Sequence, residues 1–266
     1  TRMVVGSRKW ALSTDPPLEE LRKQADKLFP AGTVQQKGRI IKEFKELPAQ
    51  EIVADPGRHF ESLSRVGYQW THDTPMSWTE IAGRMRQEKR SLCVLNTRAD
   101  ALSVLDEFEP PDVLHLSTWL CGSHRRSVIS EVKRRLESGD VCHLVSTQVI
   151  EAGVDLDFPL VMRAIAPLDS IVQSAGRCNR EGKLDLGTSV IFSPESDRLP
   201  GGFYRTATDI TRAMLQNGPI DIDQPATLVE YYQRLYSTLN TDREGIQALR
   251  THLDYPTVAD RFRMIA

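Results

Sequence analysis

The sequence predicts an α/β fold in which helices cover both faces of a parallel sheet. The main observation is that short, almost uninterrupted apolar runs alternate with helical patterns between residues 91 and 192. Composition agrees, because 40% hydrophobic and 26% charged residues in a chain of 266 are ordinary for a protein that buries a core. No run of about 18 apolar residues occurs, so we expect no transmembrane helix and no membrane partner.

The first part of the chain predicts helices separated by turns. Apolar residues recur there at helical spacing, and Asp15 followed by two prolines is typical of a helix start. Clusters of Asp, Pro and Gly mark the turns between these segments. The helices are expected at residues 15–29, 34–47 and 77–89, and the turns at residues 55–57 and 73–75.

The middle of the chain carries the predicted sheet. Each apolar run there is short enough for a buried strand and is followed by a helical pattern. The strands are expected at residues 92–95, 113–116, 141–145, 161–166 and 189–192. The helices between them are expected at residues 99–108, 123–136 and 169–179, and two later helices at residues 202–216 and 226–236.

These patterns divide the chain into three parts. A mainly helical N-terminal extension comes first, the α/β region follows, and a helical segment leads toward a further C-terminal domain. The boundaries are expected at residues 1–88, 89–195 and 196–266.

Charge and cysteine content limit the functional classes. The formal net charge is −2, so a globally basic nucleic-acid binder is not indicated, although local basic patches remain open. The four cysteines form no CxxC motif and no histidine pair has metal-ligand spacing, so we expect no metal site. Cysteines in or beside apolar segments indicate reduced packing residues and a cytoplasmic setting.

The most informative loop lies within residues 173–182, where it would follow a strand and helix of the sheet. If the segment is helical, Gln173, Arg177 and Arg180 share one face, and two guanidinium groups there suit a polyphosphate. Gly176 would destabilise a helix by about 1 kcal/mol relative to Ala, which close approach of a partner's backbone would explain. The alternative is a solvated basic helix end.

A second loop carries groups suited to phosphate and sugar. Ser146 and Thr147 directly follow a predicted strand, where hydroxyl groups can contact phosphate oxygens. Gly153 allows a tight turn, and Asp155 offers an acceptor for a ribose hydroxyl. The alternative is that the two hydroxyls cap a helix and that Gly153 belongs to an ordinary turn.

A third set of loops is basic. Thr97 and Arg98 follow the first predicted strand, and Arg125 lies at the start of the helix after the second. Residues 122–137 hold five Lys or Arg against two Asp or Glu. Positive charge at a helix N-terminus favours contact with a nucleic-acid backbone, whereas the alternative is an ordinary solvated helix face.

The order of these loops resembles the second RecA-like domain of superfamily 2 helicases. That family's motifs IV, IVa, V and VI match, in order, residues 92–98, 122–126, 146–155 and 173–180. More narrowly, residues 145–158 and 164–182 look like the CRISPR-associated helicase–nuclease of type I systems. The resemblance covers about residues 90–195 and implies a RecA-like fold for them.

The resemblance implies an ATP-dependent helicase that moves along single-stranded DNA during the degradation of invading DNA. ATP and Mg²⁺ would lie between this domain and a first RecA-like domain, with Arg180 as the arginine finger and Arg177 as its companion on the γ-phosphate. The residues implied in holding the nucleotide are Gln173, Gly153 and Asp155. The residues implied in contacting the single-strand backbone are Thr97, Arg98, Arg125 and Thr147.

Two motifs of such enzymes are absent from this sequence. Neither a GxxxxGK(S/T) phosphate loop nor a DExH or DEAD box occurs, and both, with the metal ligands, belong to the first RecA-like domain. This chain alone is therefore expected to be inactive. The pair His72-Asp73 lies among turn residues and is interpreted as a loop rather than as an HD-type nuclease motif.

The partners that the resemblance implies are single-stranded DNA, the first RecA-like domain, a nuclease domain and a crRNA-guided surveillance complex. Two other interpretations stay open. The motifs barely distinguish the CRISPR-associated family from other superfamily 2 DNA or RNA helicases. A non-catalytic nucleic-acid-binding module is the second, although such a module would not need Arg177 and Arg180 at a phosphate.

Overall fold

The computed structural model describes residues 64–239, except residues 152 and 197, and residues 245–261. The parts of the sequence interpretation that lie outside these described residues are the helices expected at 15–29 and 34–47 and the turn expected at 55–57.

The chain divides into two compact units. One comprises residues 57–239, and the other combines residues 1–56 with residues 240–266. In the second unit the described residues form two short helices, α10 (Ile246–Thr251) and α11 (Tyr255–Arg261). The chemistry of interest lies in the first unit.

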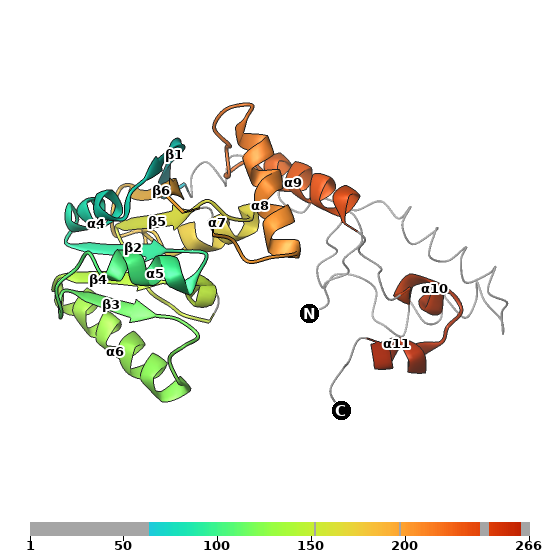
Figure 1. Cartoon of the computed structure of the whole chain (residues 1–266), viewed down its shortest axis with the longest axis horizontal. Coiled ribbons are helices and arrows are strands. Elements are labelled where there is room, and N and C mark those ends of the chain that lie inside the picture. Colours follow the sequence, from blue (N-terminus) through green and yellow to red (C-terminus); the bar gives the residue numbers. More distant parts are fainter. Residues whose placement is uncertain (1–63, 152, 197, 240–244, 262–266) are drawn as a thin grey trace. The chain divides into compact units, whose positions relative to one another are not determined.

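The unit of residues 57–239 is built on one six-stranded sheet (Figure 1). Its strands are β1 (Val66–Met76), β2 (Arg90–Val94), β3 (Val113–Leu116), β4 (Cys142–Ser146), β5 (Leu160–Ala164) and β6 (Gly187–Pro194). The strand order is β1-β6-β5-β2-β4-β3, and every neighbouring pair is parallel. The predicted parallel α/β sheet is therefore confirmed.

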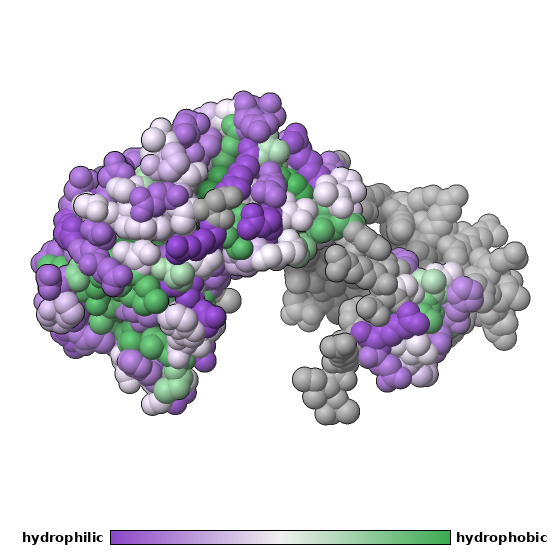
Figure 2. Space-filling view, in the orientation of Figure 1, coloured by the Kyte–Doolittle hydropathy of each residue, from purple (hydrophilic) through white to green (hydrophobic). Residues whose placement is uncertain are grey.

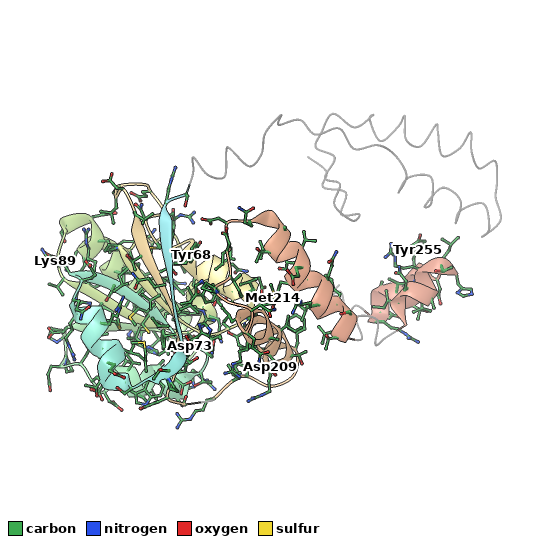
Figure 3. All side chains as sticks on the ribbon, turned by 90° about the horizontal axis from the view of Figure 1, so that it is seen from above. Tyr68, Asp73, Lys89, Asp209, Met214 and Tyr255 are labelled. Atoms are coloured by element: carbon green, nitrogen blue, oxygen red, sulfur yellow. The ribbon has the colours of Figure 1, made fainter. Side chains whose placement is uncertain are left out.

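Helices cover both faces of this sheet. They are α4 (Trp78–Arg86), α5 (Arg98–Leu105), α6 (Gly122–Ser138), α7 (Leu168–Ala175), α8 (Phe203–Leu215) and α9 (Pro225–Thr238), with a 3-10 turn, η1 (Gln148–Ile150). Successive side chains of a strand point to opposite faces, so Met162 of β5 packs with α4 and α5 whereas Val161 packs with α6. Ile191 of β6 packs with α7, α8 and α9, in the cluster that contains Met214 (Figure 3). Burial on both faces explains the almost uninterrupted apolar strands.

The edge strand β1 differs from the expectation for this part of the chain. We expected a turn at residues 73–75 within a helical extension, but the backbone there continues as a strand parallel to β6 (Tyr68 and Asp73 mark it in Figure 3). Tyr68 and Trp70 both pack against the cluster that includes α7 and α8. Their spacing of two residues is that of side chains on one face of a strand. Pro75 is tolerated because the pairing with β6 is irregular between Thr71 and Met76, at an edge of the sheet.

Two expectations based on composition can be compared with the structure. All four cysteines are free thiols, three of them buried and Cys121 exposed. In the part of the chain that the structure describes, every helix is too short or too polar to cross a bilayer. The visible surface of the larger unit is mostly hydrophilic, with hydrophobic residues in separate patches (Figure 2).

Candidate functional site

A groove of about 450 Å³ lies at the carboxyl ends of β2 and β4. We call it the strand-end groove; its lining residues are Asn96, Thr97, Arg98, Thr118, Thr147, Gln148, Val149 and Pro200. Three of the four residues expected to contact a single strand, Thr97, Arg98 and Thr147, therefore meet in one place. Ligands of open parallel sheets bind beyond such strand ends.

The threonine hydroxyls of this groove have different surroundings. Thr97 caps α5, because its hydroxyl accepts from the Asp100 backbone N–H at 3.1 Å and donates to the Asp100 carboxylate at 2.7 Å. Thr147 makes no side-chain capping bond, and only 4% of the residue is exposed. The hydroxyl of Ser146 lies 3.0 Å from the Leu116 carbonyl oxygen and so stays inside the fold. The capping alternative stated for Ser146 and Thr147 is therefore wrong, and the hydroxyl that does cap a helix here is that of Thr97.

Arg125, the fourth expected backbone contact, lies in the first turn of α6 and outside the lining of the strand-end groove. Its backbone N–H donates to the Cys121 carbonyl at 2.9 Å. Its side chain is half-buried, and the buried Nε has no hydrogen-bond partner among the described residues. The guanidinium is thus not consumed by a carboxylate of the described part of the chain.

The segment after α7 does not continue as a helix. We expected a helix over residues 169–179, but α7 ends at Ala175 and Gly176 is its C-cap. Gln173, Arg177 and Arg180 therefore do not share one helical face. Gly176 itself is right-handed, with φ of −63°, so this helix end makes no use of the conformational freedom of glycine. The left-handed residue is Asn179, with φ of 45°. The close neighbour of Gly176 is its own chain, since an added Cβ would lie 3.4 Å from the Gln173 carbonyl oxygen.

Arg177 points into the fold and holds the segment that precedes Gly153. Its Nε donates to the Ile150 carbonyl at 3.2 Å and its Nη2 to the Glu151 carbonyl at 2.8 Å. The residue is 8% exposed. Burial lowers the pKa of its guanidinium, and the charge of Arg180 lowers it further. In this arrangement Arg177 supplies hydrogen-bond donors to two backbone carbonyls of the second loop.

Arg180 is exposed and is paired with Asp155. Its Nε lies 2.6 Å from the Asp155 Oδ1, and the two side chains are 45% and 73% exposed. The structure thus brings together the expected finger and the expected ribose acceptor, which are 25 positions apart. An ion pair this exposed adds little to stability, so it constrains the direction of the guanidinium more than the fold.

The backbone around Arg180 is fixed by three neighbours. Its N–H donates to Asp157 Oδ1 at 2.7 Å, and its carbonyl accepts from Arg65 Nη1 at 3.2 Å. The amide of Asn179 donates to the Leu184 carbonyl at 2.8 Å and accepts from the Leu184 N–H at 3.0 Å. The loop that presents Arg180 is therefore pre-organised by hydrogen bonds on both sides.

The two remaining nucleotide candidates are on the surface. Gly153 is exposed and lies in a bend with φ of 73°, a left-handed conformation that glycine adopts without strain. Gln173 is exposed on α7. The space beside Gly153 is open, because an added Cβ there would meet nothing within 4 Å among the described atoms.

Comparison with known proteins identifies the region that contains these loops. Residues 87–183 match the family model described as CRISPR-associated nuclease/helicase Cas3, C-terminal. The nuclease/helicase Cas3 of Methanothermobacter thermautotrophicus is 34% identical over 186 residues, which cover 65% of this chain and 22% of that protein. The chain carries a Cas3-like C-terminal helicase domain. The nine residues that the sequence predicts at the nucleotide and the strand all lie inside the matched stretch of this Cas3-like domain.

Further relatives agree with this assignment. The nuclease/helicase Cas3 of Haloferax volcanii is 55% identical over 56 residues, or 21% of this chain and 6% of that protein. The crystal structure of T. fusca Cas3-ATP superposes with a TM-score of 0.52 at 18% identity, covering 82% of this chain and 28% of that one. This likeness confirms the RecA-like fold. The family match and the Methanothermobacter relative favour a Cas3-like domain over the domain of another helicase family.

A buried polar network lies beneath the loops of the Cas3-like domain. Its centre is Arg163 of β5, which is fully buried. The Nη2 of Arg163 lies 3.0 Å from Glu151 Oε1 and 2.8 Å from the Tyr204 hydroxyl, while Nη1 lies 2.8 Å from Asn96 Oδ1. Burial raises the pKa of the Glu151 carboxyl, and the adjacent Arg163 charge opposes this rise.

This network joins the segments that carry the site. Asn96 precedes Thr97 at the strand-end groove, and its carbonyl accepts from Gln148 Nε2 at 2.8 Å. Glu151 is also the residue whose backbone carbonyl accepts from Arg177. A contiguous set of hydrogen bonds therefore runs from the groove to the loop that presents Arg180.

Sequence interpretation missed Arg163, Glu151 and Trp119. Arg163 had a signal, since a lone arginine inside the apolar run of residues 160–166 must be paired if the strand is buried. Trp119 follows the second predicted strand and stands beside Arg98, whose guanidinium carbon lies 4.6 Å from the ring centroid. Nothing in their spacing indicates that contact.

Proposed function

We propose that this Cas3-like domain is one half of an ATP-dependent translocase that moves along single-stranded DNA during the degradation of invading DNA. The chain covers 22% of the Methanothermobacter protein, so the activity belongs to a larger assembly. The domain would supply the arginine finger to the ATP site and part of the track for the DNA.

One observation carries this proposal. A single segment runs from Thr147, in the strand-end groove, to Asp155, which pairs with Arg180. Arg177 holds the middle of that segment through the carbonyls of Ile150 and Glu151. A nucleotide at Arg180 and a DNA strand in the groove would therefore contact the two ends of one segment, which Arg177 holds by hydrogen bonds.

The residues at the Arg180 end fit a polyphosphate. Among the described residues, Nε of Arg180 contacts Asp155, and the guanidinium is partly exposed on a loop held by Asp157. Its exposed edge can therefore bind two phosphate oxygens. Bound ATP with Mg²⁺ would supply the phosphoryl group, and we propose that the metal ligands come from the first RecA-like domain. Arg180 would then stabilise the charge that develops on the transferred group.

The residues at the groove end fit a nucleic-acid backbone. Arg98 brings positive charge at the start of α5, and Thr147 lies at the end of the neighbouring strand β4. Arg125 extends the positive charge along α6. In the proposed assembly a nuclease domain cuts the moving strand, and a crRNA-guided surveillance complex recruits the enzyme.

Binding of single-stranded DNA by the 266-residue chain should be weak and sensitive to salt. One domain covers few phosphates, and each lost contact should reduce the log–log salt slope by about 0.7. We expect Arg125→Ala to weaken binding and to lower that slope, as measured by fluorescence anisotropy of a labelled oligonucleotide. The control is Arg134→Ala on the same helix, because Arg134 is engaged by Glu131 and Asp140. Equal slopes for both variants and the parent would contradict a track at Arg125.

The chain alone should not hydrolyse ATP at a meaningful rate. Its sequence holds no phosphate loop and no acidic box, so Arg180 has no bound phosphates to act on. A phosphate-release assay with single-stranded DNA and Mg²⁺ measures this. Turnover that co-purifies with the chain through further chromatography would refute the half-site assignment.

A further inference from the structure

Trp119 is an exposed aromatic residue at the edge of the strand-end groove. It follows β3, and Thr118 beside it lines the groove. The strands β2, β4 and β3 are adjacent in the sheet, so the end of β3 lies beside the strand ends that form the groove. The residue is 57% exposed, so much of the indole is open to a partner at the groove.

The turn that carries Trp119 is held in place. Its backbone N–H donates to the Ser117 hydroxyl at 3.3 Å, and Ser117 is fully buried. The Ser117 hydroxyl lies 2.9 Å from His115 Nε2, and His115 Nδ1 lies 3.1 Å from the Val145 carbonyl. A carbonyl can only accept, so Nδ1 carries the proton and Nε2 accepts from Ser117. Burial lowers the pKa of His115, which favours this neutral ring.

One face of the indole is already occupied. The Arg98 guanidinium carbon lies 4.6 Å from the ring centroid, a cation–π contact that fixes the ring's orientation. Arg98 also lines the groove, so the same side chain offers charge to a phosphate and a platform to the ring. With more than half of Trp119 still exposed, the ring retains surface for a second planar partner.

We propose that Trp119 stacks on an unpaired nucleobase of the strand bound in the groove. This proposal rests on the single-stranded DNA binding proposed above and adds the base-contacting residue. The phosphates would follow Thr97, Arg98 and Thr147, and a base turned toward β3 would meet the indole. Stacking on an aromatic ring tolerates any base, as a translocating enzyme requires.

The test compares Trp119→Ala with the parent chain on a thymidine oligonucleotide over a range of salt concentrations. Loss of one base–aromatic stack should weaken binding by at least about fivefold. The salt slope should stay unchanged, because stacking releases no counterions, whereas Arg98→Ala should lower it. Trp119→Phe should keep most of the affinity. Tyr236→Ala, an equally exposed aromatic on α9, is the matched control and should bind like the parent.

A second arm uses an oligonucleotide of the same length with abasic sites. The parent should bind this abasic strand more weakly than the normal strand. Trp119→Ala should bind the abasic strand with the same affinity as the parent does. An equal loss from the substitution on normal and abasic strands, or no loss on either, would overturn the stacking role. If the parent chain binds neither ligand at any salt concentration, the proposed DNA-binding function itself fails with it.

Discussion

Arg180→Ala in a full-length Cas3-type protein that carries this domain should lower ATP turnover by at least about 100-fold, or roughly 2.7 kcal/mol of barrier. Arginine fingers act as charge develops on the transferred phosphoryl group, so their removal affects the transition state more than the bound substrate. Affinity for nucleotide and DNA should change far less. Steady-state ATPase rates with single-stranded DNA, together with nucleotide binding measured by calorimetry, separate the two effects.

Two further variants sharpen this experiment. Arg180→Lys should not restore turnover, because an ammonium group lacks the planar two-pronged contact of a guanidinium. Lys183→Ala removes a positive charge from the same loop, where Lys183 pairs with Glu181, and should keep normal turnover. If Arg180→Ala retained ATP turnover, or unfolded the domain, Arg180 would be a structural surface charge with no catalytic role.

Arg163→Met should lower the free energy of unfolding by about 3–5 kcal/mol. The substitution leaves the Glu151 carboxylate buried without its 3.0 Å partner, and it also removes the donors to Asn96 and Tyr204. A buried charge that loses its counter-ion destabilises more than the pair itself stabilises. Urea unfolding of the chain, followed by tryptophan fluorescence, measures the change.

The double variant Arg163→Met with Glu151→Leu provides the internal control. Replacing both charges by apolar side chains should recover part of the loss, since no ion then remains buried alone. Arg134→Ala breaks an exposed ion pair and should leave the unfolding midpoint unchanged. A loss as small for Arg163→Met as for Arg134→Ala would show that the buried network contributes little.

The sheet was predictable because its signal is local. Runs such as Leu92–Leu95 are buried on both faces, and hydrophobicity alone marks them as strands. The strand β1 was missed because Asp73, Thr74 and Pro75 outweighed the alternation of Tyr68 and Trp70. Its place at the sheet edge, which makes that proline tolerable, depends on pairing with residues more than 100 positions away.

The candidate site was predictable in its residues more than in its contacts. Thr97 and Arg98 follow β2 and Thr147 follows β4, and the rule for strand ends was enough to bring them together. The end of α7 was predicted too late, since a helical pattern was extended through Gly176. The pairing of Asp155 with Arg180 could not be predicted, because it depends on how two loops pack. The catalytic and binding roles of these residues stay predictions.

The buried network around Arg163 also limits how this domain can move. It ties together the end of β2, the segment at Glu151 and the start of α8. Moving Glu151 away would leave the Arg163 charge buried without its counter-ion, and moving Asn96 or Tyr204 away would remove a hydrogen-bond acceptor from the buried guanidinium. We therefore expect the groove and the Arg180 loop to travel as one rigid body through a hydrolysis cycle. In the proposed translocase, the flexing would then fall on hinges outside the sheet, where the proposed neighbouring domains would join this one.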